Sequence, residues 1–251
     1  MTTVAFDLGM ARLLAAASDA AYDRADDIED ASPQSVFPNA VIEWVESDLA
    51  HAYVATYADR QYVAFRGTEA PIDFLTDCRA VQVQAVGPGR SHNGFVVSAQ
   101  TLWDRIRSRL ITGLPAIFAG HSKGAAEATL AAYWASLTGV NVQCVYTFGS
   151  PRVFDPIAAA AYTLPTWRIV DADDIVPHLP LAESLIGANV WAYRHVGQFA
   201  HLQSGEIELG EPVWRELVEE MADFVDGQCV VSSHLIAKYR TALATAQGVT
   251  Q

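Results

Sequence analysis

The chain of 251 residues is 51% hydrophobic, which suits one folded domain with a sizeable core over residues 1–251. Its 16 basic and 29 acidic residues give a formal net charge of -13, which opposes docking on nucleic-acid phosphates or an anionic membrane surface. The isolated cysteines, Cys78, Cys144 and Cys229, exclude a C-x-x-C metal or redox pair and favour a reducing compartment. We therefore expect a neutral or cationic partner and no nucleic acid.

The N-terminal segment has an amphipathic pattern. Phe6, Met10, Leu13, Leu14 and Ala17 recur at steps of three and four residues, which predicts one apolar face of a helix. The segment lacks a basic region followed by a long apolar stretch, so we expect no secretory signal and favour a cytoplasmic location. No apolar stretch approaches the roughly 20 residues of a membrane span, so we expect no stable membrane insertion.

An acidic cluster follows between residues 19 and 30. It lacks the glycine and the terminal glutamate of a calcium loop, so we interpret it as a solvated helix end and expect no metal site.

Strand-like and helix-like segments alternate along the rest of the chain. The predicted strands cover 51–57, 61–65, 115–119, 142–148 and 167–170, and the predicted helices cover 95–110, 125–137 and 212–225. Several strands are continuously apolar, as in strands covered on both faces. This alternation predicts an α/β fold with a mostly parallel sheet flanked by helices.

A G-x-S-x-G pattern, Gly120-His-Ser122-Lys-Gly124, lies between an apolar strand and an alanine-rich helix. In a nucleophile elbow the serine occupies a strained turn, and the flanking glycines remove Cβ atoms that would clash. The pattern therefore predicts Ser122 as the nucleophile. The Lys123 backbone N–H, at the positive end of the helix, would form half of an oxyanion hole. The alternative is a glycine-flanked loop without a catalytic role.

Three aspartates compete for the role of triad acid. Asp171, Asp173 and Asp174 follow an apolar strand and precede a proline-rich loop, so they lie at the carboxyl end of a strand, where catalytic groups gather in α/β sheets. Asp174 is our choice and Asp173 its main rival. The alternative is that these acids only cap or solvate the loop.

The triad base should follow the acid, because the chain order in this fold class is Ser, acid, His. Four histidines meet this condition: His178, His195, His201 and His234. His234 precedes the last helical pattern, and a loop there can return an imidazole over the elbow. His195 lies in a segment whose side chains alternate as in a strand, so it is interpreted as structural. His92 and His121 precede the acid, which is the wrong order for this fold class.

Four segments together resemble the class 3 lipases of filamentous-fungal type and their bacterial relatives. They are Val63-Ala-Phe-Arg-Gly-Thr68, the elbow, Tyr146-Thr-Phe-Gly-Ser-Pro-Arg152 and Asp174-Ile-Val-Pro-His-Leu-Pro180. The resemblance implies an α/β-hydrolase fold and a serine carboxylic ester hydrolase, a lipase or esterase that cleaves acylglycerols or other fatty-acyl esters without a cofactor. It implies a Ser122-Asp174-His234 triad, and Thr68 as the second oxyanion donor.

Two further features follow from the resemblance. The segment 69–77 occupies the place of a short lid, so Ile72, Phe74 and Leu75 either cover the site or join the core as an ordinary connection. Lys123 stands where relatives commonly carry leucine. Its ammonium either points to solvent, the commoner arrangement, or faces the cleft and favours esters with an acidic or polar group.

Alternative functions stay open. A phospholipase A1-type or feruloyl-type esterase would keep the same scaffold with another substrate, and a non-catalytic lipid-binding module would keep only the shape of the elbow. In each case we expect a small-molecule or lipid ester as partner, a transient lipid interface at most, and a monomer.

Overall fold

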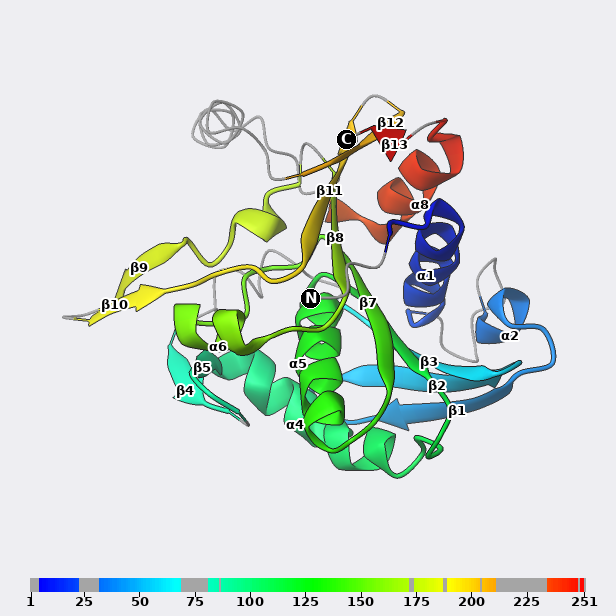
Figure 1. Ribbon diagram of the computed structural model, residues 1–251, viewed down its shortest axis with the longest axis horizontal. Helices are drawn as coiled ribbons and strands as arrows, with labels where there is room; N and C mark the ends of the chain where they lie inside the picture. The colour runs from blue at the N-terminus through cyan, green and yellow to red at the C-terminus, as the bar shows by residue number, and fades with distance from the viewer. Residues whose placement is uncertain are drawn as a thin grey trace.

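The computed structural model describes residues 5–22, 32–68, 81–85, 87–171, 174–186, 189–203, 205–210, 234–247 and 249–250. Among these residues a nine-stranded sheet runs through the molecule in the order β1-β2-β3-β6-β7-β8-β11-β12-β13 (Figure 1). Its strands are β1 (Val41–Glu46), β2 (His51–Tyr57), β3 (Arg60–Phe65), β6 (Ala116–His121), β7 (Val142–Phe148), β8 (Thr166–Asp171), β11 (Gln198–Gln203), β12 (Glu206–Leu209) and β13 (Val249–Thr250).

The centre of the sheet is parallel. β3, β6, β7, β8 and β11 run in the same direction, whereas β1 and β2 pair antiparallel with their neighbours. β12 is antiparallel to β11 and parallel to β13. Phe65 pairs with Gly120, and His121 pairs with Phe148. The carboxyl ends of the central strands therefore meet at one edge of the sheet, the edge where α/β proteins gather their functional groups.

Both faces of the sheet are covered by helices (Figure 1). The helices are α1 (Leu8–Ala20), α2 (Pro33–Val36), α4 (Asn93–Arg107), α5 (Lys123–Leu137), α6 (Pro156–Ala161) and α8 (Ile236–Thr245). Along β6, Ile117 and Ala119 pack with α1 and α8, while Ala116 and Phe118 pack with α4 and α5. Successive side chains of a strand point to opposite faces, so an apolar strand requires such cover on both sides.

The helix after the predicted base is held at its C-terminus by α1. Arg12 donates from Nε to the Leu243 carbonyl at 2.8 Å and from its terminal nitrogen to the Ala246 carbonyl at 3.1 Å. Arg240 of α8 forms an ion pair with Asp19 of α1. The two Arg12 bonds satisfy carbonyls that a helix end leaves unpaired, and together with the ion pair they hold α8, which begins two residues after His234.

The predicted mostly parallel sheet flanked by helices is confirmed. The predicted strand 51–57 matches β2, and α5 begins two residues earlier than predicted, directly after Ser122. The predicted helix 212–225 lies outside the described residues. Two small hairpins were not predicted because their strands are too short for a clear alternation: β4 (Gln82–Gln84) with β5 (Arg90–His92), and β9 (Glu183–Ile186) with β10 (Asn189–Ala192).

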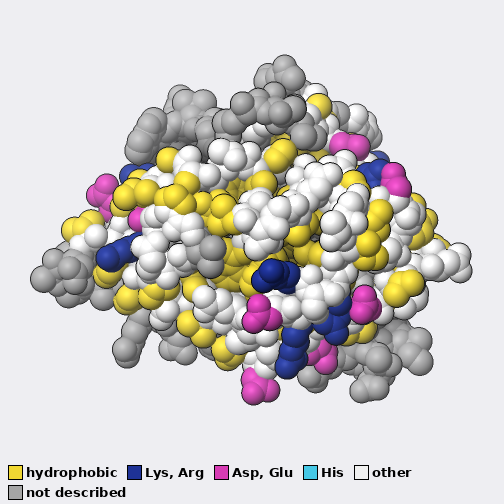
Figure 2. Space-filling view, turned by 60° about the horizontal axis from the view of Figure 1, so that its bottom comes forward, with side chains coloured by type: hydrophobic (Ala, Val, Ile, Leu, Met, Phe, Trp, Pro, Cys, Tyr) yellow, Lys and Arg dark blue, Asp and Glu magenta, His cyan; other side chains and the backbone are white. Residues whose placement is uncertain are grey.

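One face of the molecule has apolar side chains across its hollowed centre, with charged side chains of both signs mainly below it (Figure 2). Within the described part of the chain, no helix combines the length and hydrophobicity needed to cross a bilayer.

Candidate active site

Ser122 lies on a strained turn between β6 and α5. Its φ of 57° and ψ of -129° fall in a region that non-glycine residues rarely adopt, at a cost of about 1–3 kcal/mol. The turn is held from both sides, because the Ser122 N–H donates to the Phe148 carbonyl at 2.9 Å and the Ser122 carbonyl accepts from Ala125 N–H at 3.0 Å. The strand, the sharp turn and the helix thus form the elbow that the sequence predicts.

The two elbow glycines are required by close backbone approach. A Cβ at Gly120 would lie 2.3 Å from the Gly124 carbonyl oxygen, and one at Gly124 would lie 2.6 Å from the Phe65 carbonyl oxygen. Any larger residue would therefore push α5 away from β6 or from the end of β3. The same closeness brings the segment after β3 against the elbow.

Asp174 and His234 form a buried pair. His234 Nδ1 lies 2.8 Å from Asp174 Oδ2 and 3.0 Å from Oδ1, and neither side chain is exposed. Tyr239 donates its hydroxyl to Oδ2, and Val176 N–H donates to Oδ1 at 2.9 Å. Burial alone would raise the pKa of Asp174, but His234 and these other donors outweigh it and hold the pKa below its ordinary value. Asp174 therefore stays ionised and fixes the proton of His234 on Nδ1.

The other ring nitrogen of His234 is available for a proton. His234 Nε2 is buried and has no hydrogen-bond partner among the described residues. The ring packs against His121, the residue before Ser122, with ring centroids 4.6 Å apart. A Cβ at Gly149 would lie 3.0 Å from this imidazole and 2.6 Å from Asp174 Oδ2, so glycine there leaves room for the pair.

A hydrogen-bond chain that sequence reasoning missed ties His234 to the elbow. His121 Nε2 lies 2.5 Å from the His234 carbonyl, and Tyr22 Oη lies 2.7 Å from His121 Nδ1. Because a carbonyl only accepts, Nε2 carries the hydrogen and Nδ1 accepts from Tyr22, whose oxygen in turn accepts from Gly67 N–H. Burial, together with His234, lowers the pKa of His121 to about 3, so the ring is neutral. Sequence reasoning set His121 aside because it precedes the acid.

The predicted oxyanion positions lie around Ser122. A Cβ at Gly67 would be 3.1 Å from Ser122 Cβ, so Thr68, the next residue, follows a segment in contact with the nucleophile. The Lys123 N–H belongs to the first turn of α5, whose N–H groups lack partners within the helix. Thr68 and the Lys123 N–H remain predictions for this role.

The expectation that the Lys123 side chain points to solvent is wrong. Its ammonium is paired inside the protein: Nζ lies 2.8 Å from Glu127 Oε1 and 2.5 Å from the Leu49 carbonyl oxygen. Only 13% of the side chain is exposed. A preference for acidic esters through this ammonium is therefore not supported, since a buried carboxylate already pairs with it.

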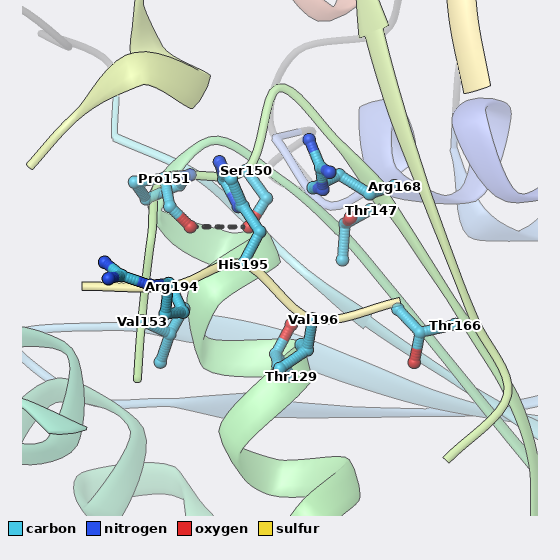
Figure 3. A pocket seen from close by; sticks show the side chains of 10 residues that line it. All are labelled: Thr129, Thr147, Ser150, Pro151, Val153, Thr166, Arg168, Arg194, His195 and Val196. Carbon is cyan, nitrogen blue, oxygen red and sulfur yellow. Dashed lines mark hydrogen bonds between the residues drawn. The ribbon is translucent and has the colours of Figure 1, made fainter. Parts of the chain in front are cut away.

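The other candidate residues lie apart from this site or outside the described part of the chain. His195 donates from Nε2 to the Pro177 carbonyl at 2.7 Å, and it lies beyond β10 instead of within a strand. Figure 3 shows it in a small pocket with Arg168 and Thr147, a pocket that none of the predicted triad residues lines. Asp173 and the lid residues Ile72, Phe74 and Leu75 lie outside the described residues.

The His, Cys, Asp and Glu side chains of the described residues form no metal site. Among them, no three His, Cys, Asp or Glu side chains come together to hold an ion. Asp19 of the acidic segment pairs with Arg240, and residues 23–31 lie outside the description.

Two buried neutral histidines make the stability depend on pH. Burial lowers the pKa of His92 to about 4 from the ordinary 6.5, and His121 behaves similarly. Between pH 6.5 and about 4 the unfolded chain binds protons that the folded chain does not, so the free energy of unfolding falls as the pH falls. The slope is about 1.4 kcal/mol per pH unit for each histidine.

The His92→Phe variant isolates one of these two contributions. Phenylalanine keeps the ring packed on Phe95, whose centroid is 4.3 Å from that of His92. We expect urea unfolding between pH 4.5 and 6.5 to show a shallower pH slope for the variant than for wild type. Equal slopes would contradict a neutral, buried His92.

Three comparisons with known proteins show that the chain is similar to lipases. Residues 62–184 match the family model "Lipase (class 3)". A lipase from Rhizomucor miehei is 32% identical over 138 residues, and the match covers 48% of this chain and 38% of that protein. The chain thus matches well under half the length of this relative, so its activity and substrates are matters for proposal.

Solved structures show the same fold. A lipase from Rhizopus microsporus var. chinensis superimposes with a TM-score of 0.66 at 22% identity, covering 80% of this chain and 76% of that one. A second structure, with a TM-score of 0.58 at 22% identity, covers 81% of this chain and 83% of its own. It is described as a triacylglycerol lipase whose catalytic centre is a serine protease triad. The chain has the α/β-hydrolase fold.

The expected cytoplasmic location is wrong. The relatives from Rhizomucor and Rhizopus are secreted fungal lipases, which contradicts it.

Proposed function

We propose, on the premise that the chain is related to the class 3 lipases through residues 62–184, that it is a serine carboxylic ester hydrolase acting on fatty-acyl esters such as acylglycerols. One observation carries the proposal. The buried Asp174-His234 pair leaves His234 Nε2 unbonded beside the strained elbow that holds Ser122. An imidazole oriented by a carboxylate next to an elbow serine is the arrangement that activates a hydroxyl.

Each residue of the proposed site has its own role in the reaction. Ser122 Oγ attacks the ester carbonyl while His234 Nε2 takes its proton, and Asp174 stabilises the resulting imidazolium. The N–H groups of Lys123 and Thr68 stabilise the oxyanion. His234 then protonates the leaving alcohol, and a water activated by the same histidine hydrolyses the acyl-enzyme. The reaction requires no metal or organic cofactor.

A fluorophosphonate probe tests this chemistry directly, because only an activated serine reacts rapidly with it. We expect stoichiometric labelling of the wild-type protein on the peptide that contains Ser122, and no labelling of the Ser122→Ala variant. A folded wild-type protein that binds lipid vesicles but resists the probe would instead be a non-catalytic lipid-binding module.

A substrate panel tests the proposed substrate class. We expect the highest kcat/KM for tributyrin or a longer triacylglycerol, lower values for phosphatidylcholine, and the lowest for methyl ferulate. The Ser122→Ala protein provides the background rate for each ester. A highest value for the phospholipid or the ferulate would replace the acylglycerol assignment while leaving the ester hydrolase intact.

A further inference from the structure

Three segments of the fold meet at Glu127, a carboxylate inside the protein. Glu127 lies in the second turn of α5 and is fully buried. Its Oε1 accepts from Lys123 Nζ at 2.8 Å and from the hydroxyl of Ser98 in α4 at 2.5 Å. Lys123 Nζ also donates to the carbonyl of Leu49, in the turn between β1 and β2, at 2.5 Å. We call these four residues, Lys123, Glu127, Ser98 and Leu49, the Glu127 box.

Burying the Glu127 carboxylate costs free energy of folding. Burial raises the pKa of Glu127, against the effect of Lys123 and Ser98. Its Oε2 is buried without a hydrogen-bond partner in the described part of the chain. A buried ion pair with an unsatisfied oxygen is typically no more stable than an apolar pair of similar volume. Stability alone therefore does not explain the presence of Lys123 and Glu127 at these positions.

The Glu127 box connects the two predicted oxyanion donors. Lys123 supplies one of them with its own backbone N–H, directly after Ser122. The Leu49 turn that its side chain holds continues into β2, where the His51 carbonyl accepts from Arg66 N–H at 2.9 Å. Arg66 precedes Thr68, the other donor, by two residues. One lysine side chain thus ties the first turn of α5 to the turn that supports the Thr68 segment.

We propose that Lys123 and Glu127 are positioning residues that fix the Lys123 and Thr68 backbones relative to each other, so that both N–H groups converge on one oxyanion. This inference rests on the proposed function. An oxyanion hole acts mainly in the transition state, and a displacement of about 1 Å costs up to about 100-fold in rate. Loss of the Glu127 box should therefore lower kcat and leave KM almost unchanged.

The kinetic test uses Lys123→Leu, Glu127→Gln and the double variant Lys123→Leu/Glu127→Leu. We expect Lys123→Leu to lower kcat about tenfold with KM within about twofold, and to lower the Tm because Glu127 loses its counter-charge. Glu127→Gln, which keeps the size of the side chain, should show a smaller loss of kcat in the same direction. The double variant should recover the Tm but not kcat, because its apolar pair lacks the bond from Nζ that joins the first turn of α5 to the Leu49 turn. Among the described residues, the Leu49 carbonyl then keeps only its bond from the Ser98 hydroxyl of α4, at 3.1 Å.

Two outcomes would overturn the proposal. One is a wild-type kcat in folded Lys123→Leu or, if that variant fails to fold, in Glu127→Gln. The other is a double variant that recovers both Tm and kcat, since the pair would then have only a structural role. Lys238→Leu is the matched control: Lys238 is the other lysine of the chain, it is exposed on α8, and its removal should change neither quantity.

The contacts of the box can be tested without any activity. Because the chain has two lysines, acetic anhydride followed by peptide mass spectrometry reports on each separately. We expect Lys238 to be acetylated at least tenfold faster than Lys123, and Glu127→Gln to reduce this difference. Equal rates in the wild type would contradict the Glu127 box itself. Resistance to the fluorophosphonate with Lys123 still protected would instead refute the proposed function.

Discussion

Replacing Ser122 with alanine should lower kcat for ester hydrolysis about a millionfold, the loss seen when a comparable triad loses its nucleophile. Alanine keeps the Cβ and the backbone at φ 57°, and the two hydrogen bonds that hold the turn involve only backbone atoms. The fold should therefore persist, with a Tm within a few degrees of wild type. Initial rates on a soluble ester and circular dichroism measure both quantities.

Ser150 provides a matched control for this variant. It is a buried serine in the loop after β7, and its hydroxyl donates to the neighbouring Pro151 carbonyl at 3.1 Å. Ser150→Ala removes one buried hydroxyl without touching the proposed nucleophile, so its kcat should stay close to that of wild type. Retention of most activity by a folded Ser122→Ala protein would overturn the assignment of the nucleophile.

The second large effect is expected for Asp174→Asn. Asparagine has nearly the same shape, but it carries no charge and its amide favours the wrong tautomer of His234, a change that costs about 10⁴ in kcat in a comparable triad. The pKa of Asp174 lies below its ordinary value, so wild type should retain this contribution down to acidic pH, whereas the variant lacks it at every pH. A pH profile of kcat/KM for both proteins measures the effect.

Asp171 and Asp173 serve as controls for the choice of acid. Asp171 ends β8, three residues before Asp174, and Asp173 is the rival from the sequence. We expect Asp171→Asn and Asp173→Asn to retain kcat within about tenfold of wild type, because the carboxylate at His234 Nδ1 remains. A loss near 10⁴ in Asp173→Asn, with Asp174→Asn active, would move the triad acid to Asp173.

The elbow is predictable from sequence because its signals are local. An apolar strand, a serine between two glycines and an alanine-rich helix lie within about 20 residues, so the motif can be recognised from a short stretch of chain. The clash that requires Gly120 is with the nearby Gly124 carbonyl, whereas the one that requires Gly124 is with the distant Phe65 carbonyl. The central strands could be predicted in the same way, since several of them contain continuous apolar stretches, as expected of strands covered on both faces. The short β4–β5 and β9–β10 hairpins carry no such pattern, so they were not foreseen.

The contacts around the triad are not local, so no pattern in the chain indicates them. Tyr22 contacts His121 across 99 positions, His121 reaches the His234 carbonyl across 113, and Tyr239 reaches Asp174 across 65. The class 3 resemblance selects Asp174 and His234 but assigns no role to Tyr22 or to His121. Their contacts form only after folding, when α1 and α8 pack side by side on the same face of the sheet.

The type of fold, the elbow at Ser122 and the residue types available for an acid and a base could be predicted from the chain alone, because strand and helix periodicity and the G-x-S-x-G motif each span only a short stretch of residues. The class 3 resemblance added the choice of Asp174 and His234. By contrast, the turn of Lys123 toward Glu127 and Leu49 and the contacts of Tyr22 with His121 and of Tyr239 with Asp174 depend on tertiary packing. The direction of a long side chain depends on which groups packing brings within about 3 Å of it, and those groups come from distant parts of the chain.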